Sequence, residues 1–141
     1  MAPGYGGAGA PAMNEPYTVY LCDDVADIRL LMRFALEEDP ELRVVGEAGD
    51  GVTGVQGVAE TQPDVVLLDL SMPQLDGLEV IARLRSVAPG VGIVVFSGFA
   101  ADRMGQVAVD LGADRYLEKG EAIEVVRETV REVARARRAA V

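Results

Sequence analysis

Histidine and tryptophan are absent from this sequence, and cysteine occurs once, as Cys22. The lack of histidine excludes a histidine-ligated metal site, a Ser-His-Asp triad and self-phosphorylation on histidine. A single cysteine can build neither a disulfide framework nor a thiolate metal cluster. Because Cys22 lies within an apolar run, we expect it to be a buried core thiol. Any histidine that takes part in this protein's chemistry must therefore belong to another protein.

Positive charge is also scarce. Thirteen basic and 23 acidic residues give a formal net charge of −10 at pH 7. Nucleic-acid binding needs a basic surface that displaces counterions from phosphates, so we expect no direct contact with nucleic acid. The sequence has no apolar run near the ~20 residues that span a bilayer. Its first residues lack the basic start and apolar core of a signal peptide. We therefore expect a cytoplasmic protein without membrane contact.

The rest of the composition suits one folded domain. Half of the 141 residues are hydrophobic, which is enough to build a core at this length. Residues 1–16, MAPGYGGAGAPAMNEP, are rich in glycine, alanine and proline and predict a flexible tail. We expect the folded domain to span residues 17–138, followed by a short C-terminal end at 139–141.

Apolar runs and helical patterns alternate five times after the tail. The runs predict strands over 17–22, 42–48, 64–70, 91–97 and 114–118. The patterns predict helices over 27–39, 52–62, 78–87, 102–111 and from 121 onward. In the first helix we expect Ile28, Leu31, Met32 and Ala35 to share one face. Such alternation predicts an α/β fold, a parallel sheet with helices on both faces.

Polar side chains follow the predicted strands at their carboxyl ends, where ligands bind in folds of this kind. Asp23 and Asp24 follow the first strand, Asp69 the third, Ser97 ends the fourth, and Lys119 follows the fifth. Three clustered carboxylates repel one another unless a cation joins them, and carboxylate oxygens suit Mg²⁺. Lys119 is the only lysine, which favours a compact ammonium at that place. We expect Asp69 to lie between a metal and this lysine.

Four motifs carry a resemblance to a known family: YLCDD, VVLLDLSMPQLDG, VVFSG and GADRYLEKG. They resemble the receiver domain of bacterial two-component response regulators, from residue 17 to about residue 135. The stretch EDPELRVVGEAGDG further resembles receivers of the LuxR/NarL type, which are normally fused to a DNA-binding helix-turn-helix domain. The resemblance implies a flavodoxin-like fold with five parallel strands in the order 2-1-3-4-5.

The same resemblance implies a role for each residue at the strand ends. Asp69 would accept a phosphoryl group from a sensor histidine kinase or a histidine phosphotransfer protein. Asp23, Asp24 and Asp69 would bind Mg²⁺ with the backbone carbonyl of Ser71, and Lys119 would neutralise the phosphoryl group. The protein would catalyse its own Mg²⁺-dependent phosphorylation and dephosphorylation, without conventional turnover.

Ser97 and Tyr116 would form the switch. Ser97 would hydrogen-bond the phosphoryl group and pull its loop inward. Tyr116 would change rotamer on the face formed by the fourth helix, fifth strand and fifth helix, where a downstream protein would bind. Receivers usually have proline after the lysine, often in a cis peptide. Here Gly120 takes that position, which leaves the peptide geometry and the placement of Lys119 open.

Two alternatives concern the function. The end of the chain, VREVARARRAAV, either complements the helix macrodipole or begins a linker to a DNA-binding domain. We expect a single-domain receiver, and the alternative is the N-terminal receiver fragment of a DNA-binding transcriptional regulator. A remote alternative is a dinucleotide-binding domain. GDGVTG (49–54) follows a strand and opens a helix, and Asp69 lies 20 residues beyond Gly49. In that case Asp50 would repel the pyrophosphate.

Overall fold

The computed structural model describes residues 15–73 and 75–140. The predicted flexible tail falls almost wholly outside these ranges. Strands and helices alternate along the described residues. The strands are β1 (Tyr17–Cys22), β2 (Leu42–Ala48), β3 (Val65–Leu68), β4 (Gly92–Ser97) and β5 (Arg115–Glu118). The helices are α1 (Ala26–Glu37), α2 (Gly51–Thr61), α3 (Gly77–Val87), α4 (Ala101–Asp110) and α5 (Ile123–Ala139). None of the described helices is long and apolar enough to cross a membrane.

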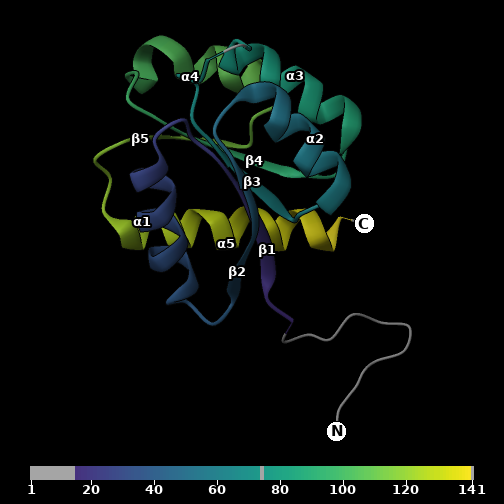
Figure 1. Ribbon diagram of the computed structural model, residues 1–141, viewed down its shortest axis with the longest axis vertical. Helices are drawn as coiled ribbons and strands as arrows, with labels where there is room; N and C mark the ends of the chain where they lie inside the picture. The colour runs from purple at the N-terminus through teal and green to yellow at the C-terminus, as the bar shows by residue number, and fades with distance from the viewer. Residues whose placement is uncertain (1–14, 74, 141) are drawn as a thin grey trace, which may run out of the picture.

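All five strands are parallel and lie in the order β2-β1-β3-β4-β5, which confirms the predicted sheet. Figure 1 shows α1 and α5 on one face of this sheet and α2, α3 and α4 on the other. Successive side chains of a strand point to opposite faces, so each face has its own core. In β1, Tyr20 and Cys22 pack towards α2 and α3, while Val19 and Leu21 pack towards α1 and α5.

Helix caps explain why some elements begin where they do. The Asp50 carboxylate accepts a 2.8 Å hydrogen bond from Thr53 N at the start of α2, and the Asp76 carboxylate accepts one of 2.8 Å from Leu78 N at the start of α3. Each cap satisfies a backbone N–H that has no partner within the helix. Asp50 thereby occupies the helix end at which a dinucleotide's pyrophosphate would bind, so that remote alternative finds no support.

The face predicted for α1 is only partly correct. Met32 is buried as expected, but Leu31 is 58% exposed. Leu36, which was not assigned to that face, is completely buried, because it lies one turn after Met32 and faces the sheet. Leu30 and Phe34 are exposed together with Leu31. Helix α1 therefore has apolar residues on its outer side as well as on its core side.

The arginines near the end of α5 are engaged with carboxylates. Arg137 pairs with Asp114 at 2.8 Å. Arg138 pairs with Asp64 at 2.6 Å and lies over the Tyr17 ring at 4.4 Å. These contacts hold the last turns of α5 at the amino ends of the strands. Asp23 and Asp69 follow strands at the opposite, carboxyl ends.

Candidate functional site

Three aspartates meet at the carboxyl edge of the sheet. Strands β1 and β3 align Cys22 with Leu68, so the residues that follow them, Asp23 and Asp69, emerge side by side. The backbone N–H of Asp69 donates to Cys22 O at 2.9 Å, which fixes this alignment. Oxygens from Asp23, Asp24 and Asp69 lie within 4.8 Å of one another. Asp23 and Asp69 are 7% and 4% exposed, whereas Asp24 faces solvent.

The two buried carboxylates are held in the same manner. One oxygen of Asp23 accepts from Val25 N at 2.9 Å, and one oxygen of Asp69 accepts from Ser71 N at 3.0 Å. The second oxygen of each faces Lys119, whose Nζ lies 2.8 Å from Asp23 and 3.2 Å from Asp69. The local turns thus orient the carboxylates, and the lysine joins them.

Lys119 is held in place by its own strand end. Its backbone N–H donates to Ser97 O at 2.7 Å. Burial alone would lower the pKa of Lys119, but the hydrogen bond to Asp23 and the charge of Asp69 outweigh it, so the pKa is raised. No cis peptide bond occurs among the described residues, and Gly120 has φ 113°. Glycine adopts this conformation without steric cost. Lys119 therefore reaches the carboxylates without the family's proline.

Ser97 and Tyr116 both contact Phe99, in the loop between β4 and α4. Ser97 is completely buried, and its Oγ accepts from Phe99 N at 3.2 Å. The Tyr116 hydroxyl donates to Phe99 O at 2.8 Å, and burial raises the pKa of that hydroxyl. Within the described residues, neither side chain hydrogen-bonds the aspartates. The structure therefore joins the two predicted switch residues through this loop.

Sequence reasoning missed two residues that shape the site. Arg29 of α1 donates to Asp23 O at 2.6 Å and pairs with Glu47 of β2 at 2.7 Å. The hydrogen bonds that Arg29 and Arg33 donate to the Glu47 carboxylate lower the pKa of Glu47. A Cβ added to Gly77 would lie 2.5 Å from Leu70 Cα, so only glycine lets α3 approach the loop after β3. The Asp-Gly pair that ends the motif VVLLDLSMPQLDG was a signal for Gly77, whereas nothing in the helical pattern of α1 singled out Arg29.

The arrangement fits a divalent cation with oxygen ligands. Three carboxylates and one ammonium leave two negative charges, which one divalent cation would balance. Carboxylate oxygens are the ligands that Mg²⁺ prefers in proteins. The exposed Asp24 leaves one side of the cluster open to solvent, from which an ion can approach.

Residues 19–131 match the family model of the response regulator receiver domain. Two curated relatives are the nitrate/nitrite response regulator protein NarL of Escherichia coli and a protein-glutamate methylesterase/protein-glutamine glutaminase of Methanospirillum hungatei. NarL is 38% identical over 106 residues, which cover 75% of this chain and 49% of NarL. The methylesterase is 33% identical over 112 residues, which cover 78% of this chain and 33% of the relative.

Solved structures agree. The receiver domain of the putative response regulator NarL from Mycobacterium tuberculosis has a TM-score of 0.81 and 30% identity, covering 86% of this chain and 98% of that one. A CheY-like receiver from Methanospirillum hungatei, at 18% identity and a TM-score of 0.81, covers 90% of this chain and 100% of that one and shares the fold. This chain belongs to the response regulator receiver domain family of two-component systems. It spans about a third to a half of the length of the curated relatives named above.

Proposed function

We propose that Asp69 accepts a phosphoryl group from the phosphohistidine of a sensor histidine kinase or a histidine phosphotransfer protein. The geometry of Asp69 supports this most directly. It is only 4% exposed, it directly follows β3, and its Oδ2 lies 3.2 Å from the ammonium of Lys119. Receiver domains of this family interact with histidine kinases and with downstream effectors.

The residues of this chain suit the transfer step. An Asp69 oxygen would attack phosphorus, a P–O bond would form, and the electron pair of the broken P–N bond would return to the donor imidazole. Such a reaction depends mainly on positioning and on neutralising charge. Ser71 N holds one Asp69 oxygen in place, and the ammonium of Lys119 would neutralise the incoming phosphoryl oxygens.

We further propose that Asp23, Asp24, Asp69 and the carbonyl of Ser71 hold Mg²⁺. Receivers generally bind this ion at an acidic cluster, and the three carboxylates here lie within 4.8 Å of one another. When bound, the ion would supply further charge neutralisation.

The output is proposed to pass through Ser97 and Tyr116. Both contact Phe99, so a movement of Ser97 towards a phosphoryl group would disturb the loop that Tyr116 also holds. We propose that a downstream protein binds the face of α4, β5 and α5, within a folded receiver of residues 17–138.

A second candidate is the receiver part of a longer DNA-binding regulator. The similarity to NarL favours it, because this chain covers 49% of that relative. Reading the complete gene decides between the two: an in-frame helix-turn-helix after α5 would establish the second candidate, and a stop codon there would exclude it.

Acetyl phosphate with Mg²⁺ tests the main proposal by mass spectrometry. The native chain should gain one phosphoryl group, and Asp69→Asn should gain none. Asp102→Asn, at an exposed position of α4, is the matched control and should be labelled like the native chain. Undiminished labelling of Asp69→Asn would refute the proposal.

A further inference from the structure

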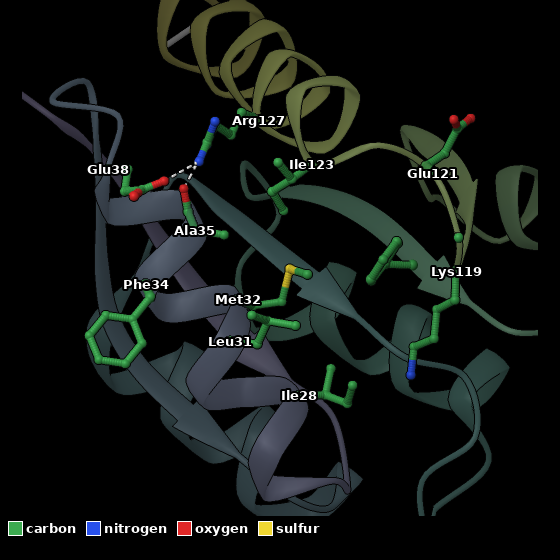
Figure 2. Close-up of a pocket in the computed structure, with 12 residues that line it drawn as sticks. Ile28, Leu31, Met32, Phe34, Ala35, Glu38, Lys119, Glu121, Ile123 and Arg127 are labelled. Carbon is green, nitrogen blue, oxygen red and sulfur yellow. Dashed lines mark hydrogen bonds and ion pairs between the residues drawn. The ribbon is translucent and has the colours of Figure 1, made fainter.

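Helix α1 presents different sides to the elements beside it. Figure 2 shows Ile28 and Met32 on the side that faces α5. Arg29 and Arg33, one helical turn apart, instead reach the carboxylate of Glu47 on β2. Arg29 Nε lies 2.7 Å from one Glu47 oxygen, and Arg33 Nη2 lies 2.9 Å from the other. The two arginines therefore form equivalent salt bridges between α1 and β2.

Of these two arginines, Arg29 also reaches the acidic edge of the sheet. Its Nη1 donates to the backbone carbonyl of Asp23 at 2.6 Å. Gly49 leaves room for the guanidinium, because a Cβ added there would lie 3.1 Å from Arg29 Nη1. The Arg29 side chain is only 18% exposed. The guanidinium thus joins β2 to the loop that carries Asp23 and Asp24.

The contact with Asp23 O fixes the backbone on one side of Asp24. The Asp23 carbonyl and the Asp24 N–H belong to one rigid peptide plane, so a hydrogen bond to the carbonyl orients that plane. The following plane is held by Val25 N, which donates to Asp23 Oδ1 at 2.9 Å. The Cα of Asp24 joins these two planes. Both contacts therefore set the direction in which the Asp24 side chain leaves the backbone.

The Asp24 carboxylate depends on this backbone for its position. It is exposed, and across residues 15–73 and 75–140 it takes part in no ion pair and no side-chain hydrogen bond. Asp23 and Asp69, by contrast, are held by Lys119 and by local N–H donors. An oxygen of Asp24 nevertheless lies within 4.8 Å of the oxygens of the other two carboxylates. The course of the backbone is what brings Asp24 into the cluster.

We propose that Arg29 is a positioning residue of the Mg²⁺ site. Through Asp23 O it orients Asp24 towards the ion, and Glu47 holds Arg29 in turn. The planar fork of an arginine can bind both partners at once, which the single ammonium of a lysine cannot do as well. The proposal rests on the Mg²⁺ site proposed above. Partners that hold the ligands of a metal typically change its affinity by about 10–100-fold when they are removed.

The sign of the change in Mg²⁺ affinity distinguishes positioning from simple electrostatics. Removal of a positive charge near a cation site strengthens cation binding by Coulomb's law. Arg29→Ala should instead bind Mg²⁺ about tenfold more weakly, because Asp24 is no longer oriented. Arg33→Ala is the matched control, since it removes the same charge and the same kind of salt bridge to Glu47, but not the contact with Asp23. It should bind Mg²⁺ no more weakly than the native chain.

NMR of the ¹⁵N-labelled full chain supplies both measurements. Titration with MgCl₂ at constant ionic strength gives the affinity from the amide shifts that follow β1 and β3. Before Mg²⁺ is added, ¹⁵N relaxation should show a less ordered Asp24 amide in Arg29→Ala than in the native chain or in Arg33→Ala. Arg29→Met keeps the apolar part of the side chain and should show the same losses, which maintains the test if Arg29→Ala fails to fold. Neither measurement uses phosphorylation of Asp69.

Three results would overturn this proposal alone. The first is a Mg²⁺ affinity of the Arg29 variants that equals or exceeds the native affinity. The second is an equal loss of affinity in Arg33→Ala, which would mean that any break in the salt bridges between α1 and β2 is sufficient. The third is an Asp24 amide that stays as ordered in the Arg29 variants as in the native chain. If the native chain itself binds no Mg²⁺, the metal site proposed above is refuted together with this role of Arg29.

Discussion

Replacing Lys119 with methionine removes the ammonium that Asp23 and Asp69 share, while keeping a side chain of similar length. The ammonium lies 2.8 Å from one carboxylate and 3.2 Å from the other. Water cannot readily replace it, because the two aspartates are only 7% and 4% exposed. We therefore expect Lys119→Met to fold with a lower free energy of unfolding.

The structure sets the size of this effect. Removing one partner of a fully buried ion pair costs about 3–5 kcal/mol. The Lys119 side chain is 28% exposed, so solvent screens part of the interaction and about 2–3 kcal/mol is expected. For a domain of this size, that corresponds to a fall in Tm of about 10 °C.

Thermal unfolding in EDTA measures the fall in Tm that the loss of the ammonium causes. Thermal unfolding in Mg²⁺ measures how much of that fall a bound cation restores. A cation that binds only the native state raises Tm. Because the variant lacks the ammonium, Mg²⁺ should raise the Tm of Lys119→Met more than that of the native chain. The control is Arg103→Met, since Arg103 is exposed on α4 and forms no ion pair among the described residues. It should change stability by less than about 0.5 kcal/mol.

Two results would refute this reasoning. One is a Tm in EDTA for Lys119→Met that equals the native value. The other is an equal response of both proteins to Mg²⁺. Either would mean that the ammonium does not compensate the buried carboxylates.

Three further predictions concern other parts of the molecule. Burial raises the pKa of the Cys22 thiol from its usual 9.0 to about 12. The contribution of this thiol to the free energy of unfolding is therefore complete below pH 9, and it declines towards pH 12 as the thiol ionises in the unfolded chain. Urea unfolding of Cys22→Ala should accordingly depend less on alkaline pH, and an equally steep dependence would contradict this. Ser97→Ala should still be phosphorylated, while the phosphorylation-dependent NMR change at Tyr116 weakens. An undiminished change at Tyr116 would exclude a link between Ser97 and Tyr116. Gly112 has φ 122° and its Cβ position lies 2.9 Å from Arg85 Cγ, so Gly112→Ala should cost more than the ~1 kcal/mol of an unfavourable glycine replacement. It should cost less in an Arg85→Ala background, and strictly additive urea-unfolding energies would rule out the clash.

The residue pattern within each segment predicted where the strands lie and that Asp23 and Asp69 meet. Apolar runs predicted β1 and β2 with the bounds that the structure has, because β1 is mostly buried and β2, at the edge of the sheet, still buries Leu42, Val44 and Ala48. The position of Asp23 and Asp69 after two parallel strands predicted that they meet, since carboxyl ends of parallel strands share one edge. The strand order itself came from the family resemblance and not from the apolar pattern.

Contacts between distant segments needed the tertiary structure. The shared partner of Ser97 and Tyr116, Phe99, lies in a loop whose path depends on how β4 and β5 align. Arg29 could not be distinguished from any other arginine of a helix until α1 was placed beside Asp23. Neither contact follows from spacing, because spacing describes only one element at a time.

Helix α1 shows this limit most clearly. Leucine, methionine and phenylalanine occur around much of its circumference, so a period of 3.6 residues fits more than one buried face. The sequence alone determined that α1 is an amphipathic helix next to the first strand. Only packing against the sheet and α5 decided that Leu36 is buried and that Leu31 and Phe34 remain exposed to solvent. Burial depends on which surface a neighbouring element covers, and that neighbour, α5, lies almost a hundred residues further along the chain.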